Sequence, residues 1–218
     1  MKTKKITVSA LFLAIATILS LFKLYELPFG GTVTVASMVP VVLIGYIYGT
    51  KWGLFSAFIY SILQLICGIG TGIVSKMFLP GDEQMLLWHA ILICIFDYIL
   101  AYISLGFGGI LKNKLKYQSS EIILGSIFAL FLCFLMHTIS GAIFYGSWAE
   151  WFFGDSTGLS QISFTKPFCD WVLSNMSGKT LAIFYSIIYN AGYMLPETVI
   201  TALVSPFIYR SIQKSNKL

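Results

Sequence analysis

The sequence predicts an all-α integral membrane protein with six transmembrane helices. Hydrophobic residues make up 57% of the 218-residue chain and charged residues only 11%, whereas a soluble domain carries about 25% charged residues. The apolar residues form long runs, and about 18 such residues suffice to cross the roughly 30 Å of membrane hydrocarbon. We therefore expect residues 1–218 to form a single membrane-embedded domain.

Six apolar segments are the candidate spans, at residues 5–24, 34–49, 52–70, 87–111, 120–146 and 181–209. The second and third meet at Gly49-Thr50-Lys51, which predicts a tight helical hairpin. Gly30-Gly31-Thr32-Val33-Thr34 is a poor helix start, so where the second span begins stays open. The runs lack the alternation of barrel strands, and the first has no clean cleavage site, which favours a retained helix over a signal peptide.

The basic residues predict the orientation of these spans. Cytoplasmic segments of membrane proteins carry an excess of Lys and Arg. With both termini cytoplasmic, the outer segments hold only Lys23, Lys76, Lys166 and Lys179. The inner segments then hold the other basic residues: Lys2, Lys4, Lys5, Lys51, Lys112, Lys114, Lys116, Arg210, Lys214 and Lys217. We therefore expect both termini to lie in the cytoplasm of a multi-pass protein of a bacterial plasma membrane.

Charge and cysteine usage exclude several functions. The net charge of +5 comes from lysines beside span ends, so we expect no nucleic-acid partner. Three of the four cysteines (Cys67, Cys94, Cys133 and Cys169) lie in apolar spans, and none has a CxxC or Cys/His spacing, so we expect no disulfide, metal or cofactor. The sequence GxxxxGK[ST] is absent, so the chain does not hydrolyse ATP itself.

Asp97 is the most informative polar residue within a span. It lies about ten residues into the fourth span and is followed by Tyr98. Polar groups in lipid are costly and commonly face a cavity or a partner. No Lys or Arg lies in any span to pair with this carboxylate. A cationic ligand would balance its charge, and aromatic rings would add cation–π attraction.

Two further spans carry polar faces. His137, Gly141 and Tyr145 follow one another at intervals of four residues, which places them on one face of the fifth span. On the sixth span Tyr185 precedes a face formed by Asn190, Tyr193 and Glu197. Three helices are thus expected to direct polar and aromatic groups toward one outward-opening region.

Structural roles compete with these functional interpretations. His137 could serve only as an interhelical hydrogen-bond partner, and Glu197 could be protonated or satisfy backbone groups freed at Pro196. The segment at about 147–180 is rich in Trp and Phe. Its aromatic residues fit an interfacial belt or an outer lid over a site.

Over nearly its whole length the chain resembles the thiamine-specific S component, the substrate-binding subunit, of energy-coupling factor (ECF) vitamin transporters. Four pieces carry the resemblance in order. They are Gly30-Gly31-Thr32-Val33-Thr34 with Ser37-Met38-Val39-Pro40; Phe96-Asp97-Tyr98; the segment 137–147 from His137 to Ser147; and Tyr185 to Asn190 running on to Tyr193-Met194-Leu195-Pro196-Glu197.

The resemblance implies the ECF S-component fold and thiamine bound near the outer face, under the first outer loop. It assigns Asp97 and Tyr98 to the positive thiazolium ring, and it matches the other family contacts to His137, Gly141, Tyr145, Tyr185 and Asn190. It also implies three partner subunits, a transmembrane coupling subunit and two ATPases. The family's small-residue motif that docks the coupling subunit matches Ala10 and Ala14, since small residues let helices approach closely.

Some positions depart from the family pattern. Some family members carry a Trp and a Glu near the start of the second helix, where this chain has Gly31 and Val35. The acidic residue of the fourth helix is Asp97 where some members have Glu, and the aromatic residue of the fifth helix is Tyr145 rather than Trp. The segment 148–180 is also longer. These differences leave open whether the ligand is thiamine, one of its phosphates or precursors, or another vitamin.

Two other function classes were weighed. A stand-alone channel or secondary transporter should show an internal repeat or a through-going polar path, and neither is visible. An intramembrane enzyme using Asp97, His137 and Glu197 would lack hydrolase or metal spacing. We therefore expect a non-enzymatic substrate-capture subunit.

Overall fold

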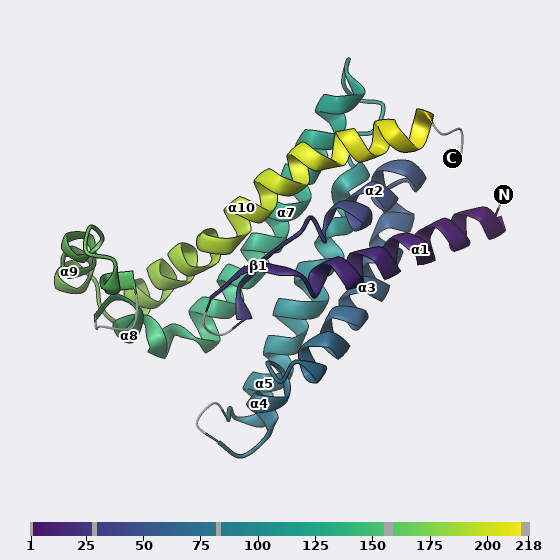
Figure 1. Ribbon diagram of the computed structural model, residues 1–218. Coiled ribbons are helices and arrows are strands. Elements are labelled where there is room, and N and C mark those ends of the chain that lie inside the picture. Colours follow the sequence, from purple (N-terminus) through teal and green to yellow (C-terminus); the bar gives the residue numbers. More distant parts are fainter. Residues whose placement is uncertain (1, 28–29, 82–83, 155–158, 215–218) are drawn as a thin grey trace.

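The computed structural model describes residues 2–27, 30–81, 84–154 and 159–214. Parts of the three predicted outer segments (28–29, 82–83 and 155–158) and Lys217 lie outside the described residues. Figure 1 shows long helices packed along one another, with the first turn of α1 and the last turn of α10 at the same end. This agrees with termini on one side of the membrane; that this side is the cytoplasm stays a prediction.

Five helical segments of the described chain are long and apolar enough to cross a membrane. They are α1 (Lys2–Ser20), α3 (Thr50–Gly70), the run Leu87–Gly109, α7 (Gln118–Phe144) and α10 (Gly178–Lys214). The predicted spans at 52–70, 87–111, 120–146 and 181–209 fall within or close to these helices. α7 and α10 lie side by side, and α1 runs along the edge of the bundle against α2 and α3 (Figure 1).

The prediction for the second span is wrong at its N-terminal end. α2 covers only Val39–Tyr48, about 15 Å of helix at 1.5 Å per residue. Residues Thr32–Thr34 instead form strand β2, which pairs antiparallel with β1 (Lys23–Glu26). The same pairing ends the first span at Ser20 rather than at residue 24.

The fourth span is not a uniform α-helix. It begins as α5 (Leu87–Ile93), continues as the π-helix η2 (Cys94–Leu100) and ends as α6 (Ala101–Ile103) and the 3₁₀ helix η3 (Ser104–Gly109). A π-helix closes its hydrogen bonds over five residues instead of four and often marks a functional site. The π-helical segment here contains Asp97 and Tyr98.

Glycine brings the backbones of α2, α3, η3 and α7 together near Gly49. A side chain at Gly45 would lie 2.6 Å from the carbonyl oxygen of Gly106, and one at Gly53 would lie 2.5 Å from the same atom. Side chains at Gly109 and Gly125 would collide with the carbonyl oxygens of Gly45 and Gly108. We call these six residues the glycine junction: Gly45, Gly53, Gly106, Gly108, Gly109 and Gly125.

Shorter elements lie at the other end of the bundle. α4 (Ser75–Phe78) precedes the fourth span, and η4 (Gly146–Trp148), α8 (Ala149–Gly154), η5 (Leu159–Gln161) and α9 (Lys166–Asn175) connect α7 to α10. Figure 1 shows α8 and α9 beside the first turns of α10. Phe153 of α8 and Cys169 and Val172 of α9 are fully buried in this connection.

Candidate functional site

A cavity lies between the β1–β2 hairpin and the inward faces of α3, the fourth span, α7 and α10. All seven residues that the sequence analysis proposed as ligand contacts line it, although they come from three separate spans: Asp97, Tyr98, His137, Gly141, Tyr145, Tyr185 and Asn190. The structure therefore places the predicted set together. Whether these residues bind the ligand stays a prediction.

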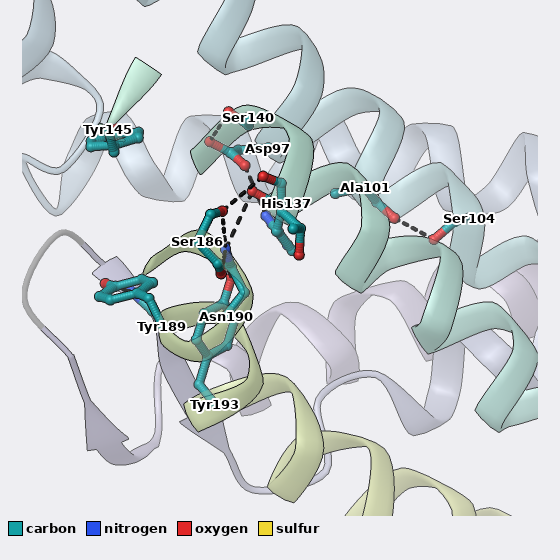
Figure 2. A network of polar contacts seen from close by, with 12 residues as sticks. Asp97, Ala101, Ser104, His137, Ser140, Tyr145, Ser186, Tyr189, Asn190 and Tyr193 are labelled. Carbon is teal, nitrogen blue, oxygen red and sulfur yellow. Dashed lines mark hydrogen bonds and ion pairs between the residues drawn. The ribbon is translucent and has the colours of Figure 1, made fainter. Parts of the chain in front are cut away.

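Asp97 is held by two side chains of α7. One carboxylate oxygen lies 2.9 Å from His137 Nδ1, and the other accepts a hydrogen bond from the Ser140 hydroxyl at 2.7 Å (Figure 2). Its side chain keeps 20% exposure, so the carboxylate is only partly enclosed. The sequence analysis found no Lys or Arg to pair with Asp97, and in the structure its partners are a histidine and a serine of another helix.

The π-helix explains how the fourth span presents so many residues to the cavity. Asp97 and Tyr102 are five residues apart, as are Ile93 and Tyr98, and all four line the cavity. In an α-helix, residues five apart diverge by more than a quarter turn, whereas the wider π turn brings them toward one side.

α10 is joined to α7 by a second polar network. The Asn190 amide donates to the backbone oxygen of Ser186 at 2.8 Å, and the Tyr193 hydroxyl donates to Asn190 Oδ1 at 2.7 Å. The Ser186 hydroxyl donates to the Thr138 carbonyl of α7 at 2.7 Å. Figure 2 shows Ser186 and Asn190 beside the His137 and Asp97 pair, and the Asn190 amide donates to the His137 carbonyl oxygen at 3.4 Å.

Gly141 allows this close approach of α7 and α10. A side chain there would collide with Ser186 Oγ and would lie 3.3 Å from the Asn190 amide nitrogen. The residue is thus required for helix packing at the cavity wall, as well as being a predicted ligand contact.

Aromatic rings enclose much of the cavity. Tyr185, Tyr189 and Tyr193 follow one another on α10, with ring centroids 5.7 and 6.2 Å apart. Tyr102 contacts His137 edge-on at 6.2 Å from the other side. Such rings present electron-rich faces that suit a flat cation.

The β1–β2 hairpin and the residues after it close one side of the cavity. Gly31, Thr34 and Ser37 are buried and line it. The Gly31 N–H donates to the Tyr189 hydroxyl at 3.3 Å, and Thr34 bonds to the carboxylate of Glu197 on α10. Glu197 is completely buried, but it satisfies Thr34 rather than backbone groups freed at Pro196.

Several lining residues were not proposed from the sequence. Tyr189 lies four residues after Tyr185, a spacing that marks a single helix face and would have identified it. Tyr193 was placed on the polar face of this span but was not among the proposed ligand contacts. Ser140, which bonds to Asp97 but does not line the cavity, lies one turn after His137. Tyr102 carried no such signal, because only the π-helix turns it to the side of Asp97.

The remaining predicted positions lie away from the cavity. Ala10 and Ala14 are exposed on α1, while Ser9, Leu13 and Ala16 of the same helix are buried against the bundle. The small-residue stripe formed by Ala10 and Ala14 therefore does not pack inside the protein. α1 reaches the cavity through Ser20 at its last turn.

The described residues hold no cluster of three or more His, Cys, Asp or Glu side chains suited to a metal ion. Cys67, Cys94, Cys133 and Cys169 are free thiols. Burial raises the pKa of the Cys169 thiol in α9 above its ordinary value, so this cysteine stays protonated and weakly reactive.

Three comparisons with known proteins agree. The family model for the thiamine transporter protein (Thia_YuaJ) matches residues 6–153. The chain is 27% identical over 204 residues to the thiamine transporter ThiT of Bacillus subtilis (strain 168), covering 88% of this chain and 83% of the relative. Its fold is similar to that of ThiT from Listeria monocytogenes, with a TM-score of 0.66, 18% identity, and coverage of 98% of this chain and 97% of that one. The chain belongs to the thiamine transporter protein family.

Proposed function

We propose that this protein is a thiamine-binding S component, which captures the vitamin in the cavity described above. Family membership makes it a multi-pass transport protein of the bacterial plasma membrane rather than an enzyme. The observation that carries the proposal for the site is the placement of Asp97 in a cavity walled by tyrosines.

The chemistry of the cavity suits thiamine. The vitamin joins a permanently cationic thiazolium ring to an aminopyrimidine. The Asp97 carboxylate lines the cavity, and its charge attracts the thiazolium ring in a partly enclosed space. Tyr98 and Tyr145 offer ring faces to the cation, and the Asn190 and Tyr193 pair offers hydrogen-bonding groups to the pyrimidine.

Titration of the purified protein with a panel of ligands tests this proposal. Calorimetry or tryptophan quenching should detect tight binding of thiamine, and much weaker binding of its neutral pyrimidine precursor, riboflavin and biotin. Thiamine phosphates in the same panel would define how far the site tolerates a negative group. Equal affinity for these compounds, none of which is a cation, would contradict the role of the carboxylate.

Uptake against a gradient requires an energy source that this chain does not supply, since the sequence contains no P-loop. We propose that an ECF transmembrane coupling subunit and two ATPase subunits supply it, and that the coupling subunit docks on Ala10 and Ala14. The support is the exposure of both alanines on a lipid-facing surface of α1. Small residues there let a second helix approach closely.

Replacement of both Ala10 and Ala14 by Trp should abolish vitamin uptake in cells that supply the partner subunits. Thiamine binding to the purified double variant should stay within about twofold of the parent, because neither residue lines the cavity. Pull-down of the coupling subunit, run beside the binding titration, separates the two effects. Loss of binding together with uptake would remove the docking role.

A further inference from the structure

The backbone at residues 31–37 forms a cavity wall without a long helix to support it. β2 contains only three residues, and Ala36, just after it, has a φ of +58°. A non-glycine residue in this left-handed region is unfavourable and persists only where the surroundings hold it. Other parts of the fold must therefore fix this wall in place.

Glu197 of α10 makes two hydrogen bonds to the cavity wall formed by residues 31–37, both to Thr34. Its Oε2 accepts the Thr34 N–H at 2.9 Å, and its Oε1 accepts the Thr34 hydroxyl at 2.7 Å, across 163 residues of chain. The Thr34 hydroxyl also lies 2.6 Å from Ser37 Oγ. Both glutamate oxygens are thus engaged by one residue of the wall.

Glu197 itself does not reach the ligand space. It is 0% exposed and absent from the cavity lining, whereas Thr34 and Ser37 belong to it. Removing a buried carboxylate leaves the donors that it satisfied without a partner, so the effect falls on the segment that carries those donors. The two hydrogen bonds of Glu197 are made to Thr34, two residues before the left-handed Ala36, and so they fix the segment that forms the cavity wall.

We infer that Glu197 is a positioning residue for thiamine binding, which holds the Thr34–Ser37 wall against the bound ligand. The inference rests on the proposed function, because its readout is the dissociation of thiamine. It predicts that loss of the glutamate oxygens releases the wall and shortens the lifetime of the complex.

Glu197→Met tests this directly, because methionine keeps the length of the side chain and removes both acceptors. The dissociation rate of thiamine should rise about tenfold, as expected when a buried hydrogen-bonding group loses its partner. Glu197→Gln should restore most of the parent's rate, since its amide oxygen can accept the Thr34 N–H while its NH₂ group donates to the Thr34 hydroxyl.

The chain offers a matched control in Glu121. This glutamate is 3% exposed and accepts hydrogen bonds from the Lys114 and Leu115 N–H groups and the Tyr46 hydroxyl, far from the cavity. Glu121→Met should lower the melting temperature and leave thiamine dissociation unchanged in the folded protein. If both methionine variants changed dissociation equally, Glu197 would have only a general role in stability and the inference would be overturned.

If Glu197→Met does not fold, Thr34→Val tests the same contact from the other side. It removes the hydroxyl donor and should raise the dissociation rate about threefold or more, with faster hydrogen exchange in peptides spanning residues 30–38. Parent-like dissociation in either folded variant overturns the inference. Failure of the parent to bind thiamine would instead overturn the proposed function.

Discussion

The bundle is packed by glycine at one end and by tyrosine around the cavity. In the glycine junction a side chain at Gly53 would lie only 2.6 Å from the Cα atom of Gly45. Further along the same helices, Tyr60 of α3 and Tyr102 of α6 stand between the backbones, with ring centroids 5.5 Å apart. Helices that touch at one end and are held apart by rings at the other diverge, and the cavity lies in the space between them.

The two regions should therefore respond differently to substitution. In the glycine junction the backbone of one helix packs directly on the backbone of the next, so a new side chain could fit only if whole helices moved apart. The cavity is lined by side chains around open space, so changes there should affect binding before they affect folding.

Gly109→Val should have the largest effect. Its side chain would collide with the Gly45 carbonyl, and we expect a loss of about 4 kcal/mol or more in the free energy of unfolding, or no folded protein at all. Thermal melting and size-exclusion profiles measure this. Gly70→Ala is the control, because that position has open space around it, and it should leave stability unchanged or slightly raised.

Asp97→Asn should have the next largest effect, now on binding rather than folding. Loss of a charge-assisted contact weakens binding by about 1.5–3 kcal/mol. Calorimetric titration with thiamine measures the change. Asp170→Asn removes an equal charge from an exposed position on α9, so an equal loss in both variants would mean that net charge, rather than a contact, drives binding.

Tyr145→Ala should reduce affinity by about 1–2 kcal/mol through loss of a ring beside the cation. Tyr145→Trp should retain or improve affinity, because it keeps an aromatic face. Binding titrations with both variants check the stacking role. Parent-like affinity in both would show that the ring stacks on nothing.

Phe152→Ala should have the smallest effect. Phe152 of α8 does not line the cavity, but its ring contacts Tyr185 at 5.2 Å and Tyr189 at 6.1 Å. We expect a loss of about 0.5–1 kcal/mol in thiamine affinity as these rings loosen, with Trp171→Ala, an exposed residue of α9, as control. A loss as large as that of Tyr145→Ala would support the predicted lid over the ligand.

Sequence analysis located the long helices because hydrocarbon thickness sets a length and composition that local sequence reveals. It misplaced the start of the second span because Thr32–Thr34 pairs with Lys23–Glu26, and such pairing depends on a partner elsewhere in the chain. The glycine junction was missed for the same reason, since a glycine in an apolar run does not reveal which backbone approaches it.

For the site, helix periodicity and family resemblance together selected seven residues that share one cavity. The search for a partner of Asp97 considered only Lys and Arg within spans, and so it missed His137 and Ser140 on a neighbouring helix. The role of Glu197 was also beyond the sequence, because Pro196 beside it suggested a local task and Thr34 lies at the opposite end of the chain.

The π-helix gives the fourth span an unusual sensitivity to changes in length. Its hydrogen bonds join residues five apart where those of an α-helix join residues four apart, so the segment behaves like a helix with one residue inserted. Deletion of a single codon between Asp97 and Tyr102 would let the segment return to α-helical winding. Everything on one side of the deletion would then turn by about 100° relative to the other, so Asp97 and the backbone contacts of Gly106 could not both stay in place. Gene variants of this family should therefore tolerate amino-acid exchange along this stretch far more readily than any change in its number of residues.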